Sequence, residues 1–276
     1  MDKLDRLVWA AGISFSVFGV RIGVRVSTEN LLAPLIRRFP VGWKPETSTI
    51  VERLYSIIGD SISRSLSVRR FGLLYGDVQQ LARTMHVEDL HEALESDMDF
   101  YLAQAARQRL FVHAGVVAWK GQAIVIPGRS QSGKSTLVKA FLEAGASYYS
   151  DEYAVFDKRG RVHPFPRLLS IRGDAHKTTS RLSAESLGSQ TGTVPLSVGV
   201  VALTSYKAGA QWRPKVLSPG RGSLGLLANA FAAREHPEQA LATLGNAVGR
   251  APILAGTRGE AADAVASILP FVERST

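Results

Sequence analysis

A glycine-rich segment in the middle of the chain carries the clearest chemical pattern. Residues 128–135 read Gly-Arg-Ser-Gln-Ser-Gly-Lys-Ser and fit the pattern G-x-x-x-x-G-K-[ST]. In this pattern the glycines turn backbone N–H groups toward phosphate oxygens, the lysine reaches the β- and γ-phosphates, and the hydroxyl holds Mg²⁺. The pattern predicts a nucleoside triphosphate site, with ATP and Mg²⁺ as the expected cofactors. The residues expected to bind the nucleotide are Gly128, Ser130, Ser132, Gly133, Lys134, Ser135 and Thr136.

The neighbouring residues fit a phosphate-binding segment between a strand and a helix. The apolar run Ala123 to Ile126 predicts a strand directly before it, and Leu137, Val138 and Phe141 predict an amphipathic helix directly after it. The N-terminus of such a helix favours anions. The alternative is a Gly/Ser turn that binds nothing.

Two acidic residues and a histidine stand where such a site needs them. Asp151 and Glu152 follow a strand expected from Ser147, one helix after the glycine-rich segment, where P-loop proteins place acids that hold Mg²⁺ or act on a nucleophile. His113 interrupts an apolar strand. The alternatives are a solvated acidic turn and a structural histidine.

Together these residues resemble the C-terminal catalytic domain of bacterial HPr kinase/phosphorylase. The resemblance rests on His113-Ala-Gly-Val-Val, on Lys134 of the glycine-rich segment 21 positions later, and on Asp151-Glu152 another 17 positions on. The run Leu168-Leu-Ser-Ile-Arg-Gly173 is similar to the family's stretch ending in Glu-Ile-Arg-Gly. Residues 110–175 carry most of the resemblance, and residues 1–95 do not look like the family's usual N-terminal domain.

The resemblance implies an α/β fold with a P-loop kinase core of the HPr-kinase type, and protein-serine phosphorylation as the activity. Asp151 would be the general base, and His113 would orient it or the phosphate. Lys134 and Arg172 would supply positive charge. The metal would be held by Ser135, Asp151 and Glu152.

One position departs from the family. The family's metal-binding glutamate falls on Ser170, and a serine hydroxyl is a weaker Mg²⁺ ligand than a carboxylate. The second acid of the family's Asp-Asp pair is Glu152, which is a smaller change. The departure predicts either a site that uses Asp151 and Glu152 alone or weakened metal binding.

The expected partner is a peptide or protein with an acceptor serine. The stretches from Leu217 and Leu226 look like shorter HPr-kinase-related kinases, including lasso-peptide tailoring kinases, so a lasso-peptide precursor is one candidate acceptor. The alternatives are a kinase of small-molecule alcohols and a nucleotide-binding regulatory ATPase that contacts DNA. The net charge of +9 favours an anionic partner. Nucleic acid is not expected, because the basic residues are scattered without a dense run. The sequence leaves the oligomeric state open.

Composition excludes several other classes of protein. With no cysteine among 276 residues, disulfide scaffolds, zinc fingers and thiol catalysis are ruled out, and a reducing cytoplasmic compartment is expected. Leu7 to Val20 is uncharged, but these 14 residues are fewer than the about 20 that a membrane-spanning helix needs. They lack a basic flank, so paired strands are favoured over a signal or anchor.

The periodicity of apolar residues predicts three parts. Residues 1–85 form a small β-rich module, 86–109 a bridging helix and 110–276 the kinase domain. Alternation predicts strands over residues 13–17 and 20–26, joined by a hairpin at Gly19. Further strands are expected at 50–58, 71–75, 110–119, 123–126, 147–156, 168–171 and 198–203, and helices at 28–39, 87–109, 134–143, 224–234, 237–248 and 259–269. Residues 173–192 predict a mobile loop, because they are rich in Ser, Thr and Gly.

Overall fold

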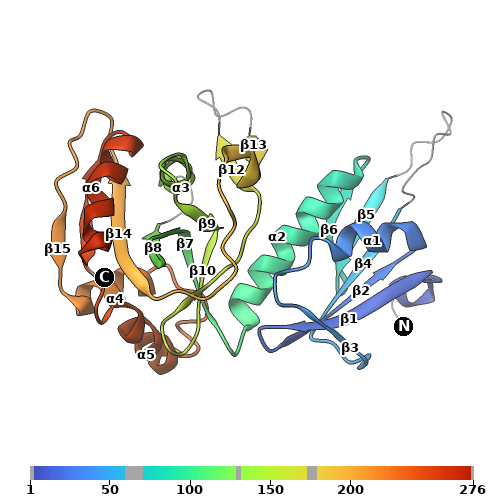
Figure 1. Ribbon diagram of the computed structural model, residues 1–276. Helices are drawn as coiled ribbons and strands as arrows, with labels where there is room; N and C mark the ends of the chain where they lie inside the picture. The colour runs from blue at the N-terminus through green and yellow to red at the C-terminus, as the bar shows by residue number, and fades with distance from the viewer. Residues whose placement is uncertain (1–2, 60–70, 129–131, 173–178, 275–276) are drawn as a thin grey trace. The chain divides into compact units, whose positions relative to one another are not determined.

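The protein is a mixed α/β chain with two sheets that each carry their own helices (Figure 1). The structure is a computed structural model that describes residues 3–59, 71–128, 132–172 and 179–274. The contacts divide the chain into two compact units, residues 1–107 and residues 108–276. Ser130 of the predicted nucleotide site lies outside the described residues.

The first unit is built on a six-stranded sheet in the order β3-β1-β2-β4-β5-β6. Strands β1 and β2 form the predicted hairpin, and their turn places Phe18 and Gly19 at φ 53° and 84°, the left-handed values that a tight two-residue hairpin turn requires. Alternate residues of β1 and β2 are buried, as the sequence pattern predicts. The strands are β1 (Ala11–Val17), β2 (Val20–Val26), β3 (Lys44–Glu46), β4 (Arg53–Ile58), β5 (Gly72–Gly76) and β6 (Gln79–Thr84).

The helix α2 (Val87–Ala105) packs on β5 and β6 and closes the core of the first unit. It ends four residues before the predicted end, because the backbone of Ala106 is extended. A polar network ties it to β4: the Tyr55 hydroxyl and Arg53 Nη2 donate to Asp97 Oδ2 at 2.8 Å and 2.9 Å. The short helix α1 (Leu32–Ile36) completes this unit and is shorter than the predicted 28–39.

The second unit is built on an eight-stranded mixed sheet that curls into a half-barrel (Figure 1). Its order is β11-β10-β7-β8-β14-β16-β15, and β9 pairs with β7 beside β10. Strands β8, β14 and β16 are parallel, so their carboxyl ends lie at one edge of the sheet. The strands are β7 (Leu110–Trp119), β8 (Gln122–Pro127), β9 (Ser147–Ser150), β10 (Tyr153–Phe156), β11 (Val162–His163), β14 (Val198–Tyr206), β15 (Lys215–Leu217) and β16 (Ile253–Arg258).

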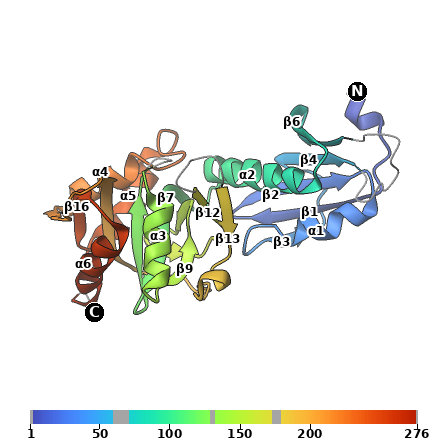
Figure 2. The same cartoon turned by 90° about the horizontal axis from the view of Figure 1, so that it is seen from above.

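Helices cover both faces of this sheet (Figure 2). The first pair, α3 (Lys134–Glu143) and α6 (Ala261–Glu273), contributes Leu137, Phe141 and Ile268 to one apolar core. The second pair, α4 (Pro219–Leu227) and α5 (Pro237–Val248), contributes Leu226 and Leu244 to the core on the opposite face.

Three predicted elements are wrong in part. Residues 147–156 form two strands, because the chain bends at Asp151 and Glu152. The helix predicted at 224–234 begins at Pro219 and ends at Leu227, since a proline in the first turn favours an earlier start. Within the predicted loop 173–192, β13 (Thr179–Leu182) pairs with β12 (Leu169–Arg172), so its polar residues are held by a strand ladder.

The uncharged stretch 7–20 contributes β1 to the first sheet, as the paired-strand alternative predicts. Among the described residues, we find no helix with the length and apolar character that a bilayer crossing requires.

We expect Tyr55→Phe to lower the free energy of unfolding by about 1 kcal/mol, because the fully buried hydroxyl loses its bond to Asp97. Tyr75→Phe is the matched control on the adjacent strand β5, because its hydroxyl reaches only Gln80 at an exposed contact of 3.3 Å. Urea denaturation measures both variants. Equal losses would show that the bond to Asp97 does not hold α2 to the sheet.

Candidate functional site

Strand β7 positions the candidate site, because it pairs with β8 on one side and with β9 and β10 on the other. The backbone carbonyl of His113 on β7 accepts a hydrogen bond of 3.2 Å from the Gly128 N–H, where the glycine-rich segment begins. On its other side, His113 lies opposite Tyr153, and the Ala114 N–H donates to the Glu152 carbonyl at 3.1 Å. One strand therefore brings the histidine, the glycine-rich segment and the acidic pair together.

The glycine-rich segment joins β8 to α3, and its glycines are required by shape. Gly133 has a φ of 82°, and its carbonyl accepts the first helical bond from the Leu137 N–H. A Cβ on Gly128 would lie 2.6 Å from Ser132 Oγ, so a larger residue there would displace the Ser132 side chain. Ser132 Oγ is buried and forms no hydrogen bond with a described residue. The start of a helix such as α3 favours an anion, because its first N–H groups have no partner within the helix.

Asp151 is buried against the start of α3. Its Oδ2 accepts a hydrogen bond of 2.9 Å from Ser135 Oγ, while its Oδ1 is buried without a hydrogen-bond partner among the described residues. Burial raises the pKa of Asp151 to about 6, and the bond from Ser135 offsets part of this effect. Ser150 fixes the bend that carries the two acids, because its Oγ accepts hydrogen bonds from the N–H groups of Glu152 and Tyr153.

His113, Lys134 and Glu152 form a second contact group in the same site. His113 Nε2 lies 3.3 Å from Lys134 Nζ and 3.4 Å from Glu152 Oε1. Burial lowers the pKa of Lys134, although the charges of Glu152 and Asp151 act in the opposite direction. The hydrogen bond with His113 lowers the pKa of Glu152, whose side chain is half exposed. Lys134 is therefore a buried cation that contacts the His113 imidazole and lies near the charges of Glu152 and Asp151.

The remaining predicted residues are less closely bound to this group. Thr136 is exposed on the first turn of α3. Ser170 is exposed on β12, and its backbone lies near enough to Asp151 to lower that residue's pKa. Arg172 ends β12, and its side chain is outside the described part of the chain.

A residue that the sequence did not suggest, Arg258, lies against the glycine-rich segment. It ends β16 and is 2% exposed. Its Nη2 donates to the Gly133 carbonyl at 2.8 Å and its Nη1 to the Gly259 carbonyl at 3.0 Å, while its Nε is buried without a partner. No described carboxylate forms an ion pair with it, and burial lowers its pKa. The apolar run Ile253 to Ala255, shortly before Arg258 and the next helix, is the pattern that would have indicated a strand ending near this position.

The oxygen atoms of the site fit a hard divalent cation. The Ser135 hydroxyl, the Asp151 carboxylate with its unpartnered oxygen and the nearby Glu152 carboxylate are ligands of the kind Mg²⁺ takes. The described residues contain no cluster of three or more His, Asp or Glu side chains able to hold a metal. This set is typical of Mg²⁺ sites that take one or two carboxylates from the protein and further oxygens from phosphates.

A scan against protein-family models and a search of curated proteins found no match for the chain. The geometry of the described residues therefore carries the functional assignment.

We expect Asp151→Asn to stabilise the metal-free protein at pH 7.5 and not at pH 4. A native pKa of about 6 against an ordinary value of 3.8 means that ionisation of this buried carboxyl costs stability as the pH rises through this window. The cost is about 3 kcal/mol above pH 6, and asparagine removes it while still accepting the bond from Ser135.

Urea denaturation in EDTA at both pH values measures this effect, with the exposed Asp263→Asn as the control. A stabilisation that is the same at both pH values would contradict the raised pKa of Asp151.

Proposed function

We propose that the chain is an ATP-dependent kinase that transfers the γ-phosphate to a serine hydroxyl of a peptide or protein. The second unit would then be a P-loop kinase core of the HPr-kinase type. The observation that carries the proposal is the bond from Ser135 Oγ to Asp151 Oδ2, at the start of α3 and directly after the glycine-rich segment. It joins the predicted phosphate-binding and metal-binding residues at one point.

The phosphates of ATP fit the start of α3. The N-terminus of a helix favours phosphate oxygens, and Lys134 adds a positive charge from the first turn of α3. Arg258 Nη2 donates to the Gly133 carbonyl. Among the described residues, no carboxylate forms an ion pair with its guanidinium. A triphosphate would supply the negative charge that this buried guanidinium lacks.

Mg²⁺ would be held by Ser135 Oγ and by the Asp151 and Glu152 carboxylates, and when bound it would neutralise phosphate charge. Asp151 orients the Ser135 hydroxyl through Oδ2. Glu152 is the more exposed of the two acids, and its contact with His113 keeps it ionised, as its lowered pKa shows.

The Asp151 carboxylate would take the proton of the acceptor, and this requires its buried Oδ1 to become accessible when the substrate binds. As the serine Oγ–H gives its proton to this oxygen, the serine oxygen forms a bond to the γ-phosphorus and the bond to the ADP oxygen breaks. In the metal-free protein, burial raises the pKa of Asp151 to about 6, so its carboxylate is ionised at neutral pH and more basic than an exposed one. His113 Nε2 would position Glu152 by donating to its carboxylate or Lys134 by accepting from its ammonium, and Arg172 at the end of β12 is proposed to add charge.

A γ-labelled ATP assay with serine peptides, polyols and DNA tests the assignment. The proposal predicts label on a serine peptide. Label on a polyol would mean a small-molecule alcohol kinase, and phosphate release stimulated only by DNA would mean a regulatory ATPase.

We expect Lys134→Ala to reduce ATP-dependent phosphorylation at least ~100-fold with little change in thermal stability, because Lys134 would act on the phosphates. Lys139→Ala on the same helix is the matched control, since its ammonium pairs with Glu143 at 2.8 Å and with no other described carboxylate. Near-normal turnover by Lys134→Ala would refute the phosphate-binding role of the glycine-rich segment.

We expect Arg258→Gln to weaken Mg–ATP binding at least ~10-fold, because it removes a buried positive charge beside the Gly133 carbonyl. Isothermal titration measures the affinity, and the exposed Arg213→Gln serves as control. Unchanged affinity in a folded Arg258→Gln protein would assign Arg258 to packing alone.

A further inference from the structure

A cavity lined by cationic side chains lies at the far end of the β7–β10 strand pair. It has a volume of about 340 Å³ and is lined by Gln108, Arg109, Asp157, Lys158, Arg159 and Arg161. Arg109 directly precedes β7, and Asp157 directly follows β10. Four of the six lining residues carry a positive charge and one carries a negative charge, so the cavity favours an anion.

The single carboxylate of the cavity is already saturated by the protein. Asp157 Oδ1 accepts the N–H groups of Arg159 and Arg161 at 2.9 Å and 3.0 Å. Its Oδ2 accepts Arg161 Nε at 2.9 Å and lies 3.1 Å from His163 Nε2. Burial raises the pKa of Asp157, but these bonds lower it by more, so the carboxylate stays ionised. Its negative charge is paired with the Arg161 guanidinium.

The other cations of the cavity have no such partner. Arg109, Lys158 and Arg159 form no ion pair with a described residue, and Arg109 Nε is buried without a hydrogen-bond acceptor. Arg109 Nη1 reaches only the neighbouring Gln108 carbonyl, at 2.9 Å. Three positive charges therefore surround the cavity without a counter-charge from the part of the chain that the structure describes.

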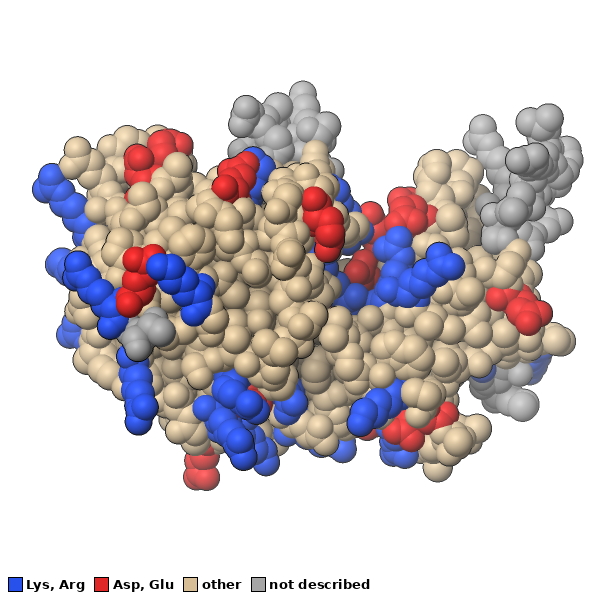
Figure 3. Space-filling model, in the orientation of Figure 1, with Lys and Arg blue, Asp and Glu red and all other residues tan. Residues whose placement is uncertain are grey.

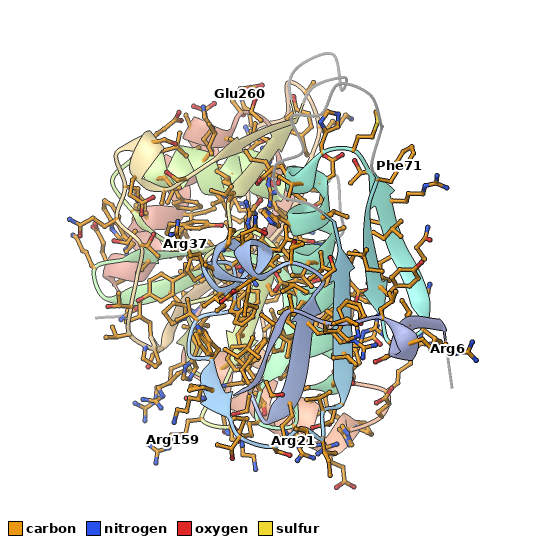
Figure 4. The ribbon with its side chains drawn as sticks, turned by 90° about the vertical axis from the view of Figure 1, so that its right-hand side faces the viewer. Arg6, Arg21, Arg37, Phe71, Arg159 and Glu260 are labelled. Atoms are coloured by element: carbon orange, nitrogen blue, oxygen red, sulfur yellow. The ribbon has the colours of Figure 1, made fainter. Side chains whose placement is uncertain are left out.

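The turn that carries these cations is held rigidly. Asn246 Nδ2 of α5 donates to the Lys158 carbonyl at 3.0 Å. Gly160 has a φ of 78° and packs so tightly on α5 that a Cβ would lie 2.3 Å from the Ala247 backbone. The Arg159 side chain projects outward from this turn (Figure 4). A fixed turn that presents cations loses little conformational entropy when it binds an anion.

The strand register relates the cavity to the candidate site. His113 lies opposite Tyr153, and Leu110 lies opposite Phe156, so the two sites occupy opposite ends of one strand pair. His113 lies four positions after Arg109 along β7, which is roughly 13 Å at the rise of a β-strand. An extended peptide spans this distance with about four residues.

We propose that the cavity binds acidic side chains of the acceptor peptide, about four residues along the peptide from the serine that is phosphorylated. This inference rests on the proposed kinase function and adds the substrate class: an acidic serine peptide. Arginine forks are suited to carboxylates. Nucleic acid needs an extended basic surface, whereas on the face seen in Figure 3 the basic side chains lie in separate groups divided by uncharged surface.

Fluorescence anisotropy without nucleotide tests the cavity. The probes are a labelled peptide with one serine and glutamates four and five residues to either side, and the same peptide with glutamines. We expect the wild-type protein to bind the glutamate peptide at least ~10-fold more tightly. Lys158→Gln/Arg159→Gln, two exposed positions, should abolish this difference. Arg213→Gln/Lys215→Gln, which removes equal charge at the opposite edge of the sheet, should preserve it.

Equal affinity of the wild-type protein for the two peptides, or an equal loss in both double variants, would overturn the proposal. So would displacement of the peptide by a single-stranded oligonucleotide at a lower concentration than by unlabelled peptide. Lys134→Ala separates the two proposals, because it should keep the charge-dependent binding. Binding that persists while no phosphorylation is found would refute the kinase function and leave the acidic-peptide site standing.

Discussion

The candidate site depends on buried charge. Among the described residues, Asp151 keeps one oxygen without a partner and Arg258 has no ionic partner, while Lys134 is buried near the charges of Asp151 and Glu152. Burying such groups costs free energy that a packed apolar core would not. Burial raises the pKa of Asp151 and lowers the pKa values of Lys134 and Arg258, so in each case it disfavours the charged form. A bound ligand that carries both a divalent cation and phosphate oxygens would supply the missing charges at once.

The topology of the second unit makes this concentration of charge possible. Strand β7 pairs with the strand that leads into the glycine-rich segment and with the strands on both sides of the acidic bend. The parallel strands β8 and β16 end on the same edge, so Arg258 reaches the Gly133 carbonyl across 125 positions of sequence. Apolar cores on both faces of the sheet hold these strands in place. The β7–β10 strand pair has the candidate site at one end and the cationic cavity at the other.

The periodicity of apolar residues predicted those strands and helices whose bounds depend on neighbouring residues. The β1–β2 hairpin follows from alternation and Gly19, and the bounds of α3 and α5 were predicted correctly from periodicity. The proximity of Ser135 to Asp151 was expected from the position of the acidic pair one helix after the glycine-rich segment and from the resemblance, whereas their bond is made by the sheet. The bend at Asp151 was missed, since it depends on two bonds to the Ser150 hydroxyl within an otherwise strand-like run. Arg258 was missed because its partner is a distant carbonyl, and periodicity does not encode such contacts.

Isothermal titration of the wild-type protein with the non-hydrolysable analogue AMP-PNP, with Mg²⁺ and again in EDTA, tests the central claim most directly. If Lys134, Arg258 and the Ser135–Asp151 pair form a site for a metal-bound triphosphate, one equivalent should bind with Mg²⁺, and the affinity should fall at least ~10-fold in EDTA. No binding, or binding of the same affinity in EDTA, would contradict the account, because the buried carboxylate would then have no cation to hold.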